Sequence, residues 1–201
     1  MTDYFALMSE PRRPWLEADT LKAKFIALSA ETHPDKAETE NEAERAVAAG
    51  AFAEVNAAYH ALADPKLRLL HLLELESGVK PGEIQQIPAS LADLFAEVAT
   101  ACQSTDRFLA EKSLVTSPLL HVHWFERSQE WVERLNVLQQ KLNGLHGQVV
   151  EQLKKVDAKW TGADTAGRQA LLPALEELYR LFGYFSRWSR QIQERVLQLM
   201  V

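Results

Sequence analysis

The sequence predicts an all-α protein, in which an N-terminal helical hairpin with short flanking helices is followed by a long antiparallel three-helix bundle. Apolar residues recur at spacings of three and four along most of the chain, which is the period of one face of a helix. Alanine, leucine, glutamate and glutamine are abundant, whereas valine, isoleucine and threonine are sparse, and this balance favours helices. Eight glycines and eight prolines among 201 residues leave room for long helices.

The N-terminal domain is expected to cover residues 1–77 and to form four helices. Two apolar stripes at helical spacing predict its longer helices, and a proline-rich stretch predicts a break after the first one. A proline in the first turn and a glycine just past the end bound the fourth helix. The stripes are Leu21, Phe25 and Leu28, and Phe52, Val55, Tyr59 and Leu62. The expected ranges are 3–9, 18–32, 41–63 and 65–78.

A glycine- and proline-rich segment, 78–88, is the predicted linker, and residues 89–201 are the predicted bundle. Heptad spacing predicts one long helix of about 40 residues that continues through Gly144 and Gly147. In the last helix, Pro173 is expected to cause a kink or to mark the true start. A long seam, meaning a line of apolar residues at heptad spacing along one helix face, can also pair with a second chain. A homodimer through the bundle therefore stays open as an alternative. The seam of the long helix is Trp124, Trp131, Leu135, Leu138, Leu142, Leu145, Val149 and Val156.

Composition and charge exclude several classes of protein. No apolar run approaches the roughly 18 residues of a membrane span, and the first residues lack the basic and apolar regions of a signal peptide. Cys102 is the only cysteine, so no internal disulfide can form, and a cytoplasmic location is expected. The net charge of −6 lies entirely within residues 1–77, which hold eight basic and fourteen acidic side chains. An acidic balance argues against nucleic-acid binding, which needs a basic surface.

The stretch His33-Pro34-Asp35-Lys36 falls between the second and third predicted helices. Pro34 disfavours the α conformation for His33, so the second helix should stop there. Asp35 suits a turn, because its carboxylate can accept from nearby backbone N–H groups. A charged, rigid tip on a helical hairpin indicates a surface for a partner.

Together with three other segments, this stretch resembles the J domain of DnaJ-type co-chaperones. The order and spacing of the segments are most similar to the HscB branch, whose members serve iron–sulfur cluster assembly. The resemblance covers roughly residues 3–77, a little over a third of the chain. The other segments are Asp3-Tyr4-Phe5 with Leu7, Val55-Asn56-Ala57-Ala58-Tyr59-His60-Ala61-Leu62, and Asp64-Pro65-Lys66-Leu67-Arg68.

The resemblance implies a partner and a role for each tip residue. His33 and Asp35 would engage the nucleotide-binding domain of a DnaK- or HscA-type ATPase chaperone and stimulate its ATP hydrolysis, and Pro34 would fix the turn. The second helix of a J domain usually carries basic residues that steer docking. The chaperone-binding residues expected here are therefore His33, Pro34, Asp35, Lys36, Lys22 and Lys24.

HscB-type proteins also carry a helical bundle after the J domain, and there it binds the scaffold on which the cluster is built. The resemblance thus implies an iron–sulfur scaffold protein as client, with Leu91, Leu94 and Phe95 as the expected contacts. Two other interpretations stay open. One is a J-domain protein that serves a different client. The other is an adaptor with a degenerate J fold and no chaperone-stimulating activity.

No metal site, cofactor or enzymatic activity is expected. His121 and His123 are two residues apart, so on a helix they point to different faces, and no cysteine or carboxylate cluster completes a site. The sequence shows no glycine-rich phosphate loop, no recognisable carboxylate pair and no nucleophile beside a base. Trp160 and Trp188 fall off the seams and are interpreted as candidates for an interface or for packing between the two parts.

Overall fold

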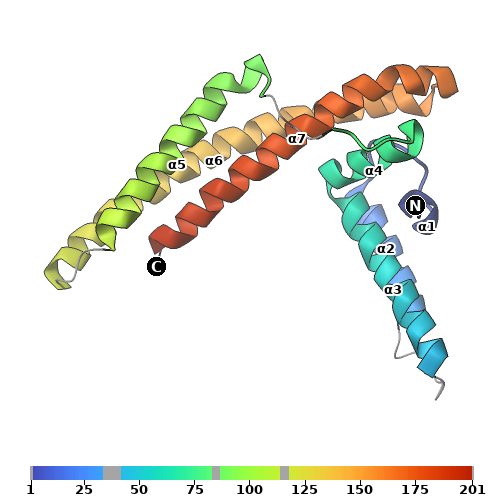
Figure 1. Ribbon diagram of the computed structural model, residues 1–201, viewed down its shortest axis with the longest axis horizontal. Helices are drawn as coiled ribbons and strands as arrows, with labels where there is room; N and C mark the ends of the chain where they lie inside the picture. Colours follow the sequence, from blue (N-terminus) through green and yellow to red (C-terminus); the bar gives the residue numbers. More distant parts are fainter. Residues whose placement is uncertain (1, 34–41, 83–86, 114–117, 201) are drawn as a thin grey trace. The chain divides into compact units, whose positions relative to one another are not determined.

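The computed structural model describes residues 2–33, 42–82, 87–113 and 118–200 (Figure 1). Within these ranges every regular element is a helix, which confirms the all-α prediction. Most boundaries fall within a residue or two of the predicted ones. The elements are α1 (Tyr4–Leu7), α2 (Ala18–Thr32), α3 (Glu42–Ala63), α4 (Pro65–Ser77), the 3₁₀ turn η2 (Ala89–Leu91), α5 (Ala92–Lys112), α6 (Pro118–Thr161) and α7 (Thr165–Met200).

The chain divides into two compact units, and each unit is assembled from two separate stretches of sequence. The first unit combines residues 1–82 with 151–180, and the second combines 83–150 with 181–201. Both α6 and α7 therefore contribute to both units. The predicted boundaries at 78–88 do not coincide with this division, because part of the predicted bundle packs with the N-terminal helices. A domain boundary at 78–88 stays a prediction.

Local signals in the sequence set the helix ends of the first unit. Pro65 occupies the first turn of α4, and the Asp64 carboxylate accepts from the N–H of Leu67 at 2.9 Å. At the other end of α4, Gly78 adopts a left-handed φ of 72° that closes the helix. Ser9 takes a φ of 50°, which is unusual for a residue with a Cβ, and α1 is accordingly shorter than predicted.

The α2–α3 hairpin is the main layer of the N-terminal helices, and its two helices lie side by side (Figure 1). The rings of Phe25 and Tyr59 stack across the pair with centroids 4.1 Å apart. Leu21, Val55 and Leu62 are buried in the same interface. Burial of aromatic and aliphatic side chains along one stripe of each helix supplies the main stabilisation, as the predicted stripes require.

The end of α6 packs against residues 12–15 within the first unit. The Asp157 carboxylate accepts from Arg13 through Nε at 3.0 Å and through Nη2, and it also accepts from the N–H of Trp15 at 3.0 Å. Trp160 is fully buried, and its indole Nε1 donates to the carbonyl of Arg12 at 2.9 Å. The Asp157 interaction raises the pKa of Arg13. Two side chains of α6 therefore hold the chain between α1 and α2 in place.

His71 joins α4 to α1 through an unprotonated ring nitrogen. The N–H of Tyr4 donates to Nε2 of His71 at 3.0 Å, and the imidazole stacks on the Tyr4 ring with centroids 4.6 Å apart. Burial lowers the pKa of His71, against the opposing effect of the Asp3 and Glu74 carboxylates. Protonation of Nε2 would remove the acceptor and place a charge in a buried site.

The free energy of unfolding is expected to fall as the pH drops through the ordinary histidine pKa of 6.5. Below that pH the unfolded chain takes up a proton on His71 that the folded chain does not, so stability should be lost progressively as the pH falls from 7 to 5. Urea unfolding across this range measures it. His71→Gln keeps an acceptor that does not titrate and should flatten the dependence. An unchanged slope in that variant would assign the effect to other groups.

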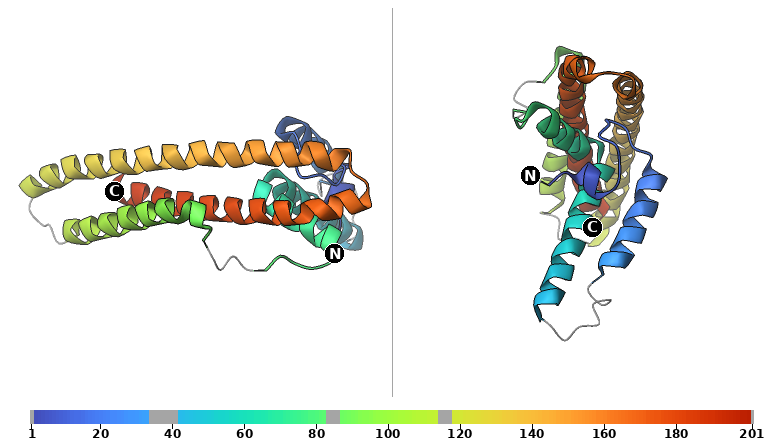
Figure 2. Two further views of the ribbon diagram at one scale, coloured as in Figure 1. Left: turned by 90° about the horizontal axis from the view of Figure 1, so that it is seen from above. Right: turned by 90° about the vertical axis from the view of Figure 1, so that its right-hand side faces the viewer.

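In the second unit, α5 packs against α6 and α7 as a three-helix bundle (Figure 2). The Phe108 ring of α5 lies 5.0 Å from that of Trp124 and 6.0 Å from that of Trp131, centroid to centroid. Arg195 of α7 donates to the Asp106 carboxylate at 2.7 Å and, at 3.3 Å, to the carbonyl of Cys102. The bundle predicted from the seams is confirmed.

The long helix predicted through Gly144 and Gly147 is confirmed, because α6 runs without a break from Pro118 to Thr161. Pro173 lies inside α7 and so does not mark its start. The seam residues Leu135, Leu138 and Leu142 are buried within one chain, and the seam therefore gives no support to the homodimer alternative. None of the helices that the structure describes is long and apolar enough to cross a membrane.

Of the two roles predicted for Trp160 and Trp188, an exposed interface is wrong for both, whereas packing between the two predicted parts is confirmed for Trp160, which donates to the carbonyl of Arg12. Their exposed fractions are 0% and 3%, so neither indole offers a surface to a partner. Trp188 packs within the second unit against the rings of Tyr184 and Phe185. Off-seam positions can be buried where a third helix or a loop covers them, and the heptad pattern does not report that cover.

Candidate chaperone-binding site

His33 ends α2 and begins the tip of the hairpin. Its φ of −60° and ψ of 129° are extended, as expected for a residue that precedes proline. Its ring contacts the ring of Phe52 edge-on, with centroids 5.3 Å apart, so the imidazole packs against α3. Pro34, Asp35 and Lys36, which were predicted for the same site, lie outside the described residues.

Most of the cations near α2 are engaged within the first unit. The Lys24 ammonium donates to the carbonyl of Ser9 at 2.7 Å and pairs with the Glu10 carboxylate at 2.7 Å. Arg12 pairs with Asp3 at 2.7 Å, and Arg13 pairs with Asp157. Lys22 is exposed and, among the residues described, has no carboxylate partner. Of the two basic contacts predicted on α2, only Lys22 is therefore free to meet a partner.

The Asp3–Arg12 pair also steadies α1. Burial of Asp3 tends to raise its pKa, but the hydrogen bonds from Arg12 and from the backbone N–H groups of Ala6 and Phe5 outweigh this, so the pKa is lowered. The carboxylate caps the helix while it is ionised. Both Asp3 and Arg12 thus serve the fold, and neither is available as a docking charge.

Arg68 is a supporting residue whose role the sequence did not reveal. It is buried, and its guanidinium donates to the carbonyls of Pro14, at 2.8 Å, and of Leu62, at 2.7 Å. Burial lowers the pKa of Arg68 to about 10. The guanidinium carbon of Arg68 lies 5.6 Å from the centroid of the Trp15 ring. The only sign of this role in the sequence is an arginine placed among the leucines of α4. Such a pattern does not identify partners that lie more than fifty residues away, as Pro14 and Trp15 do.

The three predicted client contacts differ in exposure. Leu91 and Leu94 are only 9% and 6% exposed, because they face the interior of the second unit, whereas Phe95 is 44% exposed. Phe95 lies at the edge of a shallow groove between α5 and α7, with its ring 6.3 Å from that of Trp188. The groove is lined by Phe95, Val98, Cys102, Asp106, Trp188 and Arg195. Its lining mixes apolar and polar side chains, because Gln103 and Gln191 also border it, and Arg195 is held by Asp106.

Within the described part of the chain, no group of three or more histidine, cysteine, aspartate or glutamate side chains is arranged to hold a metal ion. His123 is exposed at the start of α6. Cys102 is buried, and burial raises the pKa of its thiol, so the reactive thiolate is disfavoured.

Residues 3–71 match the family model described as the DnaJ domain. These residues are a J domain. The match contains α1 to α3 and the first half of α4, and it includes His33, the lysines of α2 and the two arginines of the preceding loop. The resemblance to J domains is therefore confirmed.

Curated relatives extend the similarity of this J-domain protein to the HscB co-chaperones. It is 40% identical over 77 residues to a co-chaperone protein HscB homolog of Bordetella petrii, which covers 38% of this chain and 45% of that protein. It is 36% identical over 84 residues to the homolog of Vibrio cholerae, covering 42% of this chain and 48% of the relative. The chain thus matches a little under half the length of these relatives.

Solved structures show the same fold over the whole J-domain protein. The chaperone HscB from Vibrio cholerae superposes with a TM-score of 0.65 at 22% identity and covers 100% of both chains. The human co-chaperone HscB superposes with a TM-score of 0.56 at 20% identity, covering 96% of this chain and 82% of the human one. At such identities the likeness establishes the fold, a J domain followed by a helical bundle.

Proposed function

We propose that this J-domain protein is a co-chaperone that stimulates ATP hydrolysis by a DnaK- or HscA-type chaperone. The observation that carries the proposal is the position of His33, at the end of α2 and within the matched J domain, directly before Pro34 and Asp35. The imidazole packs edge-on against the Phe52 ring. Asp35 supplies a carboxylate two residues later in the sequence.

In this reaction the J-domain protein would act by binding the chaperone, and the chaperone itself would hydrolyse ATP. A partner accelerates hydrolysis by another protein when it binds the hydrolysis-competent conformation more tightly than the resting one. A histidine and an aspartate offer the chaperone a hydrogen-bonding ring and a charged acceptor. Their loss should abolish stimulation without affecting the fold, because His33 ends its helix and is only half-buried.

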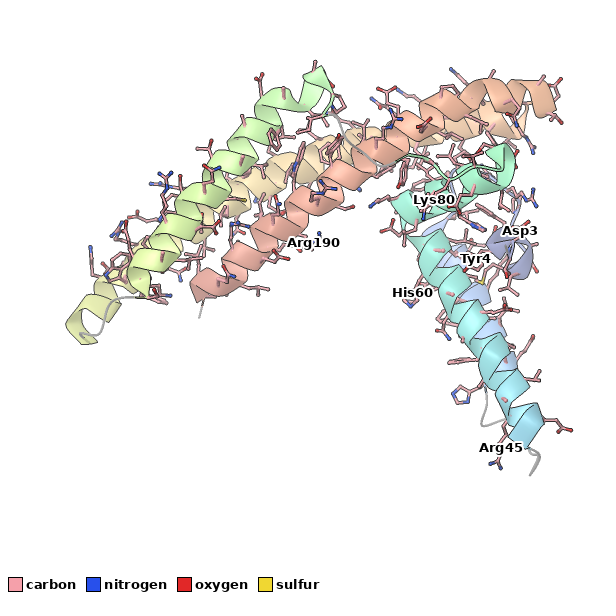
Figure 3. The ribbon with its side chains drawn as sticks, in the orientation of Figure 1. Asp3, Tyr4, Arg45, His60, Lys80 and Arg190 are labelled. Atoms are coloured by element: carbon pink, nitrogen blue, oxygen red, sulfur yellow. The ribbon has the colours of Figure 1, made fainter. Side chains whose placement is uncertain are left out.

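His33→Gln is expected to reduce the stimulation of ATP hydrolysis at least about tenfold, equivalent to about 1.4 kcal/mol of lost differential binding. Single-turnover hydrolysis by a DnaK- or HscA-type chaperone measures it. His60→Gln is the matched control, since His60 is an exposed histidine on α3 of the same hairpin (Figure 3). Equal stimulation by wild type and His33→Gln would contradict the proposal. No stimulation by any of the three proteins would favour the adaptor interpretation.

We further propose that the bundle holds an iron–sulfur scaffold protein as client, in the groove between α5 and α7. The similarity to HscB co-chaperones supports the class of client, and exposed Phe95 beside Trp188 supports the place. Leu91 and Leu94 are left out of this contact because they are buried. An exposed aromatic side chain at the rim of a groove is a common anchor for a protein partner.

Phe95→Ala is expected to weaken the scaffold complex about tenfold by calorimetry, the size of loss that a partly buried aromatic anchor gives on truncation. Phe125→Ala is the control, because Phe125 is an exposed phenylalanine of α6. If wild type binds no scaffold protein but still stimulates the chaperone, the client belongs to another class. The co-chaperone proposal would stand in that case.

A further inference from the structure

The outward face of α2 carries an apolar strip. Ala23, Ile26, Ala27 and Ala30 recur at spacings of three and four, so they share one face of the helix, and all four are exposed. Ile26 is 57% exposed and forms the centre of this α2 strip. Leu21, on the opposite face, is buried against α3. A partner that covered Ile26 and its neighbouring alanines would remove their apolar surface from water, which favours binding.

Charge does not compensate for this apolar character. Lys24 is tied to Ser9 and Glu10, and the two arginines of the preceding loop are paired with Asp3 and Asp157. A cation that is already paired adds little to the field that steers a partner. What α2 offers is therefore one free lysine, Lys22, beside the α2 strip.

The α2 strip is continuous with the proposed chaperone-binding tip. Ala30 lies one helical turn before His33, so a partner that grips His33 also covers the last part of the strip. One isoleucine and three alanines are too small to hold a second copy of this chain, since stable interfaces bury about 800 Å² on each side. They suffice as an extension of the contact made at the tip.

We infer that α2 docks its ATPase chaperone by apolar contact centred on Ile26, and that the chaperone surface facing α2 is apolar. This inference rests on the proposed co-chaperone function and adds the chemistry of the partner. Apolar burial is insensitive to screening, whereas attraction between exposed charges weakens as salt rises. The J-domain protein is thus selective for a chaperone with a matching apolar patch, and a chaperone with a strongly acidic surface there is a poor partner.

The test is single-turnover ATP hydrolysis by the chaperone, titrated with the full-length J-domain protein from about 50 mM to about 500 mM NaCl, where screening becomes strong. For wild type, the concentration giving half-maximal stimulation should change less than about threefold over this range. Ile26→Ser should raise that concentration about tenfold while the maximal rate stays the same, because docking is weakened and the tip is intact. His33→Gln should instead lower the maximal rate.

Two further variants separate docking from folding. Ile26→Leu should restore half-maximal stimulation to within about twofold of wild type, because the buried area is conserved. Val79→Ser removes another exposed aliphatic side chain, after α4, and should have no effect. An unchanged Ile26→Ser, with a steep salt dependence that Lys22→Ala abolishes, would overturn the inference and leave the proposed function in place. No stimulation by wild type would overturn both.

Discussion

Asp157→Ala is expected to lower the free energy of unfolding by about 2 kcal/mol, because a partly buried arginine and a backbone N–H lose their shared acceptor. The Asp157 carboxylate accepts from Arg13 twice and from the backbone N–H of Trp15, and its side chain is almost wholly buried. In the variant, the Arg13 guanidinium and the Trp15 N–H lose their acceptor together. Both are partly covered by the first unit, so water only partly replaces it.

Urea unfolding followed by circular dichroism measures this loss. Glu151→Ala is the matched control on the same helix, because the pair of Glu151 with Lys154 is exposed and should contribute less than about 0.5 kcal/mol. A double-mutant cycle with Arg13→Ala would give the coupling of the pair itself. If Asp157→Ala costs no more than Glu151→Ala, the contact between α6 and residues 12–15 does not stabilise the first unit.

Trp160→Ala is expected to be more destabilising still, by about 4 kcal/mol, as for large aromatic residues removed from a core. Trp160 is fully buried, and its truncation leaves both a cavity and an unpaired carbonyl at Arg12. The guanidinium of Arg168, 5.4 Å from the indole ring, would also lose its aromatic neighbour.

Trp160→Phe separates the two contributions. It keeps most of the volume and loses the hydrogen bond, so a cost of about 1–2 kcal/mol is expected. Thermal or urea unfolding of the three proteins gives the comparison. If Trp160→Phe were as costly as Trp160→Ala, the bond to the Arg12 carbonyl would be the dominant contribution and the packing a minor one.

Short-range signals made most of the fold predictable. Pro34, Pro65 and Gly78 bound helices through their own backbone preferences, and the ends of α2 and α4 fall where those residues predict. The uninterrupted α6 follows from a seam that keeps its phase, because two glycines reduce helix stability by only about 1 kcal/mol each. Each of these effects acts within a few residues, which is the range that a sequence pattern reports.

The burial and the hydrogen-bond partners of individual side chains were less predictable, because they depend on long-range contacts. Trp160 meets a carbonyl 148 positions away, and Arg13 meets a carboxylate 144 positions away. Likewise, Leu94 and Phe95 are adjacent in sequence, yet only Phe95 faces outward, because α6 and α7 decide which side of α5 is covered. For the chaperone-binding site, His33 was identifiable from its motif. The ion pair of Lys24 with Glu10, which makes Lys24 unavailable for docking, was not.

The interleaving of the two compact units has a consequence for how the chain acquires its structure during synthesis. Residues 1–82 emerge from the ribosome long before 151–180, the second stretch of their unit. At about 5–20 residues per second, the N-terminal helices wait several seconds for Asp157 and Trp160 to arrive. During that interval Arg13 and Trp15 lack their partner on α6, so these contacts are among the last to form in the first unit. A fragment ending near residue 82 would lack them altogether.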